Sequence, residues 1–184
     1  MKKVIFLLAI VLISFFSCKK ETPEKEEAVI GKNSVSCAPQ TVDAKWYTSD
    51  NKAPLFKGMD VIDYKITTKN TEAQKYFNQG LGLSYGFNHA EAARSFYYAT
   101  KLDPECAMCF WGLAYVLGPN YNAGMEPDNY ERAYKAIQTA LKLSGKVSES
   151  EKALINALSK RYVAKPVEDR GKLDIAYSDD MKEV

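Results

Sequence analysis

From about Asn70 onward, apolar and small residues recur at spacings of three and four, and no stretch alternates as a β-strand would. This periodicity indicates a series of amphipathic helices, each with an apolar side that must pack against a neighbour. We therefore expect an all-α fold over residues 70–184, in which consecutive helices form antiparallel pairs.

Local signals divide this region into six helices. Three pairs combine an N-cap residue with a glutamate three places later, which together satisfy free amides at a helix start: Asn88 with Glu91, Asp128 with Glu131, and Ser148 with Glu151. Pro104 suits the first position of another helix. Stop signals occur at Gly118-Pro119, Ser144-Gly145 and Pro166. The predicted helices run near residues 71–86, 88–102, 104–117, 128–143 and 149–163, with a last one from about 170.

The N-terminus is typical of an export signal. Lys2 and Lys3 precede the apolar run VIFLLAIVLISFF, which is shorter than the roughly 20 residues that a membrane-spanning helix needs. Ser17 and Cys18 follow and resemble the lipobox of bacterial lipoproteins, in which a peptidase cuts before a cysteine that then carries acyl chains. We predict a signal peptide at residues 1–17 and lipidation of Cys18, with ordinary secretion as the alternative.

Residues 18–69 are interpreted as a flexible tether and lead-in segment. The stretch 19–40 is charged and poor in large apolar side chains, so it cannot bury enough surface to offset its chain entropy. Without Lys2 and Lys3 the chain carries 23 basic and 23 acidic side chains, and this balance gives no electrostatic case for a nucleic-acid partner.

Internal similarity supports a repeat. Superposing the chain on itself at 34 residues places Gly80 on Ala114, and at 41 residues it places Ala92, Phe96 and Ala99 on Ala133, Ile137 and Ala140. The difference of seven indicates an insertion at GPNYNAGMEP. The stretch YFNQGLGLSYGFNHAEAARSFYYATKLDP resembles a tetratricopeptide repeat, with its Gly, Ala, Phe, Ala and Pro at the eighth, twentieth, twenty-fourth, twenty-seventh and thirty-second positions of that repeat.

The resemblance implies an α-solenoid in which small residues let helices approach closely while Phe96 fills the gap between them. Two positions depart from the pattern: Gln79 stands where leucine is usual, and Gly145 stands where the second repeat would have proline. The predicted packing positions are Gly80, Ala92, Phe96, Ala99, Pro104, Leu113, Ala114, Ala133, Ile137 and Ala140.

More closely, the words ITTKNTEAQKYFNQGLGLSYGFNHAEAARSF and LDPECAMCFWGLAYVLGPNYN resemble a type of exported bacterial tetratricopeptide protein over roughly residues 66–163. Members of that type are usually longer and have no assigned reaction. We therefore expect the chain to be the N-terminal part of a longer protein, with its repeat domain at 70–184 cut short.

Cys106 and Cys109 form a C-x-x-C at the start of a predicted helix, where free amides would favour a reactive thiol. Covalent haem would need histidine where Phe110 stands, and zinc would need about four ligands. His89 cannot complete such a site, because a helix of roughly 20 Å separates it from Cys106. A structural disulfide, buried packing, and a redox or metal function stay open, and no cofactor is predicted.

His89 is the only histidine of the chain. In an antiparallel stack its turn should lie beside the inserted loop, which would place five polar residues at one edge: Asn88, His89, Glu91, Asn120 and Asn122. One interpretation is helix capping with a hydrogen bond from His89 to the loop, and the other is a small polar pocket or a metal contact.

These observations predict a non-enzymatic binding module or scaffold for an unidentified protein or peptide. Its lipid anchor would place it in the bacterial outer membrane, on the periplasmic or the surface face. Adjacent aromatic residues such as Phe96, Tyr97 and Tyr98 cannot all point inward, and exposed tyrosines make good anchors for peptides. The alternative is a redox-active or metal-binding envelope protein that uses Cys106 and Cys109.

Overall fold

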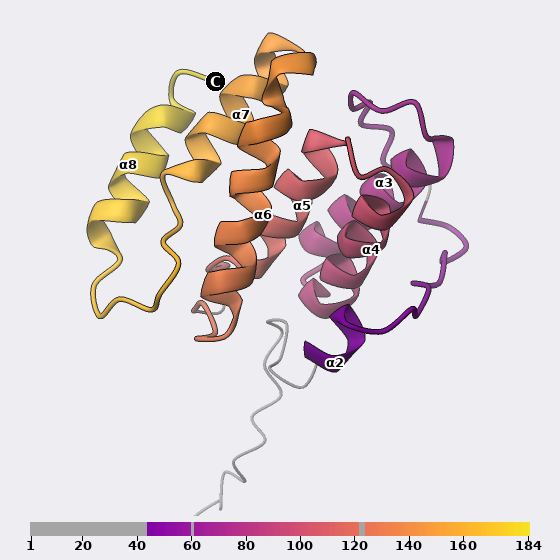
Figure 1. The fold of residues 1–184 in the computed structure, drawn as a ribbon, viewed down its shortest axis with the longest axis horizontal. Helices are drawn as coiled ribbons and strands as arrows, with labels where there is room; N and C mark the ends of the chain where they lie inside the picture. Colours follow the sequence, from indigo (N-terminus) through magenta and orange to yellow (C-terminus); the bar gives the residue numbers. More distant parts are fainter. Residues whose placement is uncertain (1–43, 60, 122–123) are drawn as a thin grey trace, which may run out of the picture. The chain divides into compact units, whose positions relative to one another are not determined.

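The computed structural model of the chain describes residues 44–59, 61–121 and 124–184, and this part is all-α (Figure 1). It contains seven α-helices and no β-strand within those residues. The helices are α2 (Ala44–Tyr47), α3 (Thr71–Tyr85), α4 (His89–Leu102), α5 (Ala107–Leu117), α6 (Asn129–Leu143), α7 (Glu149–Ser159) and α8 (Gly171–Met181), with a 3-10 turn at Ser144–Lys146. The predicted signal peptide, Cys18 and the charged stretch 19–40 of the predicted tether lie outside the described residues.

Each helix from α3 onward packs against the next one along the chain, and α5 also contacts α3 and α7. Only residues 86–88 join α3 to α4, so these two helices run antiparallel, side by side (Figure 1). The turn between α3 and α4 and the connection between α5 and α6 lie at the same end of the helices. This arrangement buries the apolar sides that the sequence periodicity marked.

Phe96 of α4 lies at the centre of the core. Its side chain is fully buried between Gly80 of α3 and Gly112 of α5. A Cβ atom added at Gly80 would lie 2.9 Å from the Phe96 ring, and one added at Gly112 would lie 2.4 Å from it. Both glycines are therefore needed because the ring occupies the space that any side chain there would take.

Two helix boundaries differ from the prediction. The third predicted helix begins at Ala107 rather than at Pro104, because Asp103 accepts hydrogen bonds from the backbone of Glu105 and Cys106 and forms a turn before the helix starts. The predicted helix 149–163 ends at Ser159, and the chain then turns so that Tyr162 is buried. The Tyr162 hydroxyl donates to the carbonyl oxygen of Ala114 over 2.6 Å.

The three predicted capping pairs have different outcomes. Ser148 and Glu151 form a complete capping box, as predicted. Asp128 makes no side-chain cap bond, so that prediction was wrong; its carboxylate instead pairs with Arg132 over 2.9 Å. Asn88 caps the amide of Glu91, but the Glu91 carboxylate pairs with Arg94 instead of returning to the cap. A guanidinium within one helical turn competes for the same carboxylate.

Candidate functional site

Two glutamine side chains of α3 hold the extended chain that precedes this helix. We call residues 53–59 and 61–66 the lead-in loop. Gln79 donates to the carbonyl oxygen of Pro54 and accepts from the amide of Phe56, both over 2.8 Å. Gln74 does the same with Tyr64 and Ile66, over 2.8 and 3.1 Å. Each side-chain amide thus pairs with a C=O and with the N–H two residues later, the two groups that one edge of an extended strand presents.

The contacts of Gln79 explain why this position departs from the leucine that is usual in the repeat pattern. Gln79 is buried and also donates to the Ser95 hydroxyl of α4 over 3.0 Å. Leucine at this position could pack against α4, but it could not pair with the lead-in loop. The burial of this polar side chain is tolerated because its hydrogen-bonding groups have partners.

We predict that Gln79→Leu loosens the lead-in loop. The change removes three hydrogen bonds and leaves partly buried backbone groups unpaired, so the free energy of unfolding should fall by about 1–3 kcal/mol. Hydrogen exchange of the Phe56 amide should accelerate more than that of amides within α5. Gln138→Leu on α6 serves as the matched control, and equal acceleration in the two variants would contradict the role of Gln79.

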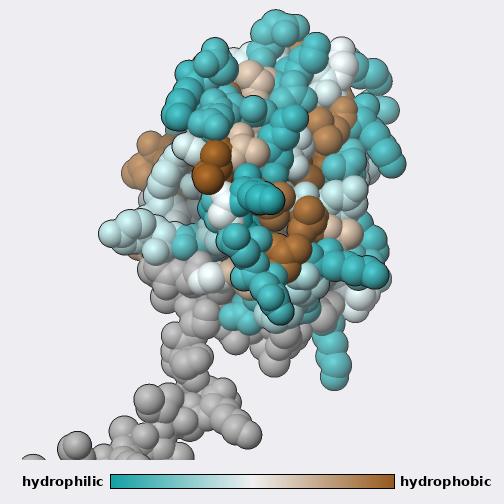
Figure 2. All heavy atoms as spheres, turned by 90° about the vertical axis from the view of Figure 1, so that its left-hand side faces the viewer, coloured by the Kyte–Doolittle hydropathy of each residue, from teal (hydrophilic) through white to brown (hydrophobic). Residues whose placement is uncertain are grey.

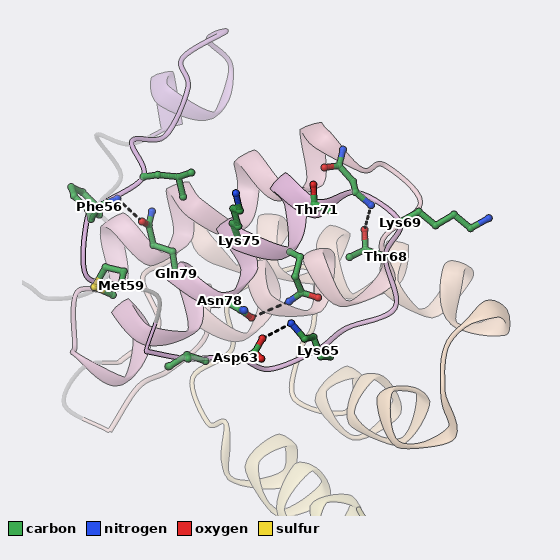
Figure 3. Close-up of a pocket in the computed structure, with 14 residues that line it drawn as sticks. Phe56, Met59, Asp63, Lys65, Thr68, Lys69, Thr71, Lys75, Asn78 and Gln79 are labelled. Carbon is green, nitrogen blue, oxygen red and sulfur yellow. Dashed lines mark hydrogen bonds and ion pairs between the residues drawn. The ribbon is translucent and has the colours of Figure 1, made fainter.

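A cavity of about 620 Å³ lies between the lead-in loop and the outer side of α3 (Figure 3). Helix α3 forms its floor with Lys75, Asn78 and Gln79, while Phe56 and Met59 lie at one end and Lys69 at the other. The full lining is Leu55, Phe56, Met59, Ile62, Asp63, Lys65, Thr68, Lys69, Asn70, Thr71, Gln74, Lys75, Asn78 and Gln79.

The lining of the cavity carries a local excess of positive charge. Its described residues include three lysines and one aspartate, and among these lysines Lys65 is paired, with Asp63 at 2.5 Å. Lys69 and Lys75 are exposed and form no ion pair with any residue that the structure describes.

A second candidate surface is an aromatic cluster drawn from three helices, Tyr85 of α3, Trp111 and Tyr115 of α5, and Tyr177 of α8. The rings of Trp111 and Tyr115 stack with their centroids 5.2 Å apart, and the Trp111 indole donates to the carbonyl oxygen of Leu154. Burial raises the pKa of the Tyr115 phenol, and the neighbouring Tyr85 and Tyr177 raise it further. Tyr85 is 66% exposed. The cluster therefore offers flat apolar faces and hydroxyl groups at the surface.

Arg161 and Asp174 form an ion pair beside this cluster. Its guanidinium lies 4.9 Å from the centre of the Tyr177 ring and 3.5 Å from a carboxylate oxygen of Asp174. Burial raises the pKa of Tyr177 and the arginine opposes that rise. The guanidinium is thus already paired with a carboxylate of the same chain and packs on a half-buried ring, which orders this edge of the cluster.

Cys106 and Cys109 form a disulfide at the start of α5. Cys106 is the N-cap residue, and its sulfur accepts from the amide of Cys109 over 3.1 Å. The residues are 1% and 0% exposed, so an external thiolate cannot reach either sulfur without local opening. Among the residues that the structure describes, no group of three metal-ligating side chains occurs. The geometry favours a structural role for this pair.

We expect the disulfide to resist reduction in the folded protein. With an alkylating agent and a mild reductant, native protein should show no modified Cys106 or Cys109 by mass spectrometry, whereas denatured protein should show both modified. The denatured sample also serves as the control for reagent activity. Rapid modification of Cys106 in native protein would contradict a structural role.

The structure describes four of the five polar residues that were predicted to lie at one edge near His89. His89 begins α4, is buried, and lies edge-on to the Phe87 ring with centroids 6.1 Å apart. Asn120 bonds within its own turn, to the carbonyl oxygen of Gly118 over 3.2 Å. Asn122 lies outside the described residues. The polar groups of Asn88, Glu91 and Asn120 thus bond locally, and a shared pocket is not evident among them.

Nine of the ten predicted packing positions are buried, and the exception is Pro104, which lies exposed in the turn before α5. Sequence reasoning missed Gly112, although a glycine inside an apolar helix can indicate close packing. It also missed the pairing of Gln74 and Gln79 with the lead-in loop. That pairing has no local sequence signal, because its two partners are 8 to 25 residues apart.

Comparisons with models of protein families, with curated proteins and with solved structures found no significant match.

Proposed function

We propose that this chain is a lipid-anchored helical scaffold that binds an extended segment of a partner protein or peptide in the bacterial envelope. The observation that carries the proposal is the aromatic cluster at the surface of α3, α5 and α8. Tyrosine and tryptophan supply large contact areas at low entropic cost and dominate many peptide interfaces. The Arg161–Asp174 pair beside Tyr177 orders this edge of the cluster.

The helix packing supports a tetratricopeptide-like arrangement. Phe96 fills the space between two helix pairs at two glycines, which is the role that the repeat pattern assigns to a large residue between small ones. Solenoids of this kind present extended surfaces to their partners. The lipid anchor rests on the sequence around Cys18. In the part of the chain that the structure describes, no helix has the length and apolar character needed to cross a membrane.

The redox alternative has less support, because both sulfurs of Cys106 and Cys109 are buried. A redox-active pair needs an exposed sulfur that another thiolate can attack. We therefore assign the pair a structural role within a non-enzymatic module.

The proposal is tested by selecting displayed random peptides on the purified chain and measuring their dissociation constants. For a selected peptide, Tyr85→Ala and Tyr177→Ala should each weaken binding by roughly tenfold or more, as expected of interface hot spots. Tyr121→Ala is the control, because Tyr121 is fully exposed and outside the cluster. An absence of enriched peptides, or equal losses in all three variants, would reject the function.

The lipid anchor is tested separately with labelled palmitate. Label that attaches equally to the wild type and to a Cys18→Ala variant would reject the anchor.

A further inference from the structure

The cavity under the lead-in loop has two unlike ends (Figure 3). Its apolar end includes Phe56, Met59 and Ile62, and the last two lie against α3 at Gly82, where an added Cβ would come within 3.0 Å of the Met59 methyl and 3.4 Å of Ile62. Its polar end includes Lys69 and Thr71. A ligand that fills the whole cavity must therefore combine an apolar part with a polar group.

The charge of the lining determines which polar group fits. Lys75 stands on the floor, one helical turn after Thr71, and Lys69 stands at the polar end. Neither lysine has an anionic partner among the described residues, whereas Asp63 is already paired with Lys65. Figure 3 shows Lys75 on the floor and the exposed Lys69 side chain extended away from it. An anion beside Lys75 would therefore meet one ammonium group directly and a second on a flexible side chain, and no unpaired carboxylate among the described lining residues.

The hydrogen bonds of the loop argue against a polypeptide in this cavity. A bound peptide would need partners for its own N–H and C=O groups. Among the backbone groups of the loop, those of Pro54, Phe56, Tyr64 and Ile66 are already paired with Gln74 and Gln79. A ligand without backbone amides does not need such partners, and the cavity volume lies in the range of small-molecule sites.

We propose that the cavity binds a small amphiphilic anion, an apolar chain or ring that ends in a carboxylate. The apolar part contacts Phe56, Met59 and Ile62, and the carboxylate lies beside Lys75, where the exposed Lys69 side chain can turn toward it. The cavity and the aromatic cluster share no residue, and the ligand proposed for the cavity is of a different class from the peptide proposed for the cluster.

The first test is calorimetry of the purified chain with three probes of equal chain length: decanoate, decanol and decyltrimethylammonium. Decanoate should bind most tightly, and the cationic probe should not bind measurably. Added salt should weaken the binding of decanoate, because the two lysines are exposed. Equal binding of all three probes would show a merely apolar surface and would overturn the proposal.

Lysine variants separate the charge from the apolar contact. In the double variant Lys69→Gln with Lys75→Gln, decanoate should bind roughly tenfold more weakly while decanol is unaffected. Lys142→Gln on α6 is the matched control, since Lys142 is an exposed lysine outside the cavity. Equal effects of the double variant and the control would overturn the assignment of the lysines.

Methyl resonances locate the ligand. Decanoate should shift the methyl signal of Met59, which lines the cavity, and leave that of Met108, which is fully buried in the core of α5. A shift of Met108 alone would place the ligand elsewhere. Displacement of decanoate by an alternating Leu-Glu octapeptide that binds more tightly would identify the occupant as a polypeptide, and would also overturn the proposal.

Discussion

Phe96→Ala should lower the free energy of unfolding by about 3–5 kcal/mol, which is typical for truncating a fully buried aromatic residue. Phe96 contacts Gly80 and Gly112 and lies edge-on to the Phe77 ring, with centroids 5.4 Å apart. Gly80 and Gly112 have no side chains that could move into the space that the ring leaves, so only Phe77 among these neighbours could fill part of it. A loss of this size is a large part of the 5–15 kcal/mol that typical domains have. Urea denaturation followed by circular dichroism measures it.

Phe87→Ala is the control for this prediction, because Phe87 is largely exposed and its loss should change stability by about 0.5 kcal/mol or less.

Gly112→Ala tests the same contact from the other side. Alanine normally stabilises a helix relative to glycine by about 1 kcal/mol. Here its Cβ would collide with a buried ring, so a destabilisation of about 1–3 kcal/mol is expected. Stabilisation by Gly112→Ala would show that the helices are less closely packed than described.

Glu151→Ala should cost about 3 kcal/mol, because one buried carboxylate joins two distant parts of the chain. Its two oxygens accept from the amide and the hydroxyl of Thr67, each over 2.6 Å, and from the amide of Ser148 over 2.9 Å. Removing the carboxylate leaves these donors unpaired and breaks the capping box of α7. Denaturation by urea measures the loss, and Glu149→Ala is the control, since Glu149 is an exposed residue of the same helical turn.

The same carboxylate predicts a pH dependence of stability. Burial raises the pKa of Glu151, but hydrogen bonds from Thr67 and Ser148 lower it by more, so the folded-state pKa lies below the ordinary value. A lowered folded-state pKa gives stability that is present above the unfolded pKa of about 4.3 and is lost as the pH falls through the folded value. The stability difference between the wild type and Glu151→Gln should therefore shrink below about pH 4. A constant difference down to pH 2 would contradict the carboxylate's role.

An uncovered apolar surface accompanies α8. Figure 2, turned to the side that carries α8, shows apolar side chains between hydrophilic ones. Ile175 of this helix is largely exposed, and no residue of α8 is buried. The sequence shows Ile175 at a helical position but does not show whether anything covers it, because coverage depends on what packs next to α8.

The all-α fold and most helix boundaries follow from the sequence, because periodicity and capping are local properties of the chain. The start of α5 was mispredicted because Asp103 forms a turn with the amides of Glu105 and Cys106, and the end of α7 was mispredicted because Tyr162 bonds to Ala114 outside its own helix. The capping pair at Asp128 failed for a related reason, since Arg132 competed for its carboxylate. Such competition is decided by geometry that a spacing rule does not contain.

The sequence by itself determined that the chain forms amphipathic helices with small residues and Phe96 on their facing sides, because the choice of an apolar side is written in the residue spacing. Only the tertiary structure decided how the lead-in loop is held on α3, and where the cavity and the aromatic cluster lie. Those features depend on contacts between residues far apart in sequence, such as Thr67 with Glu151, and a contact of that kind leaves no periodic signal in the chain.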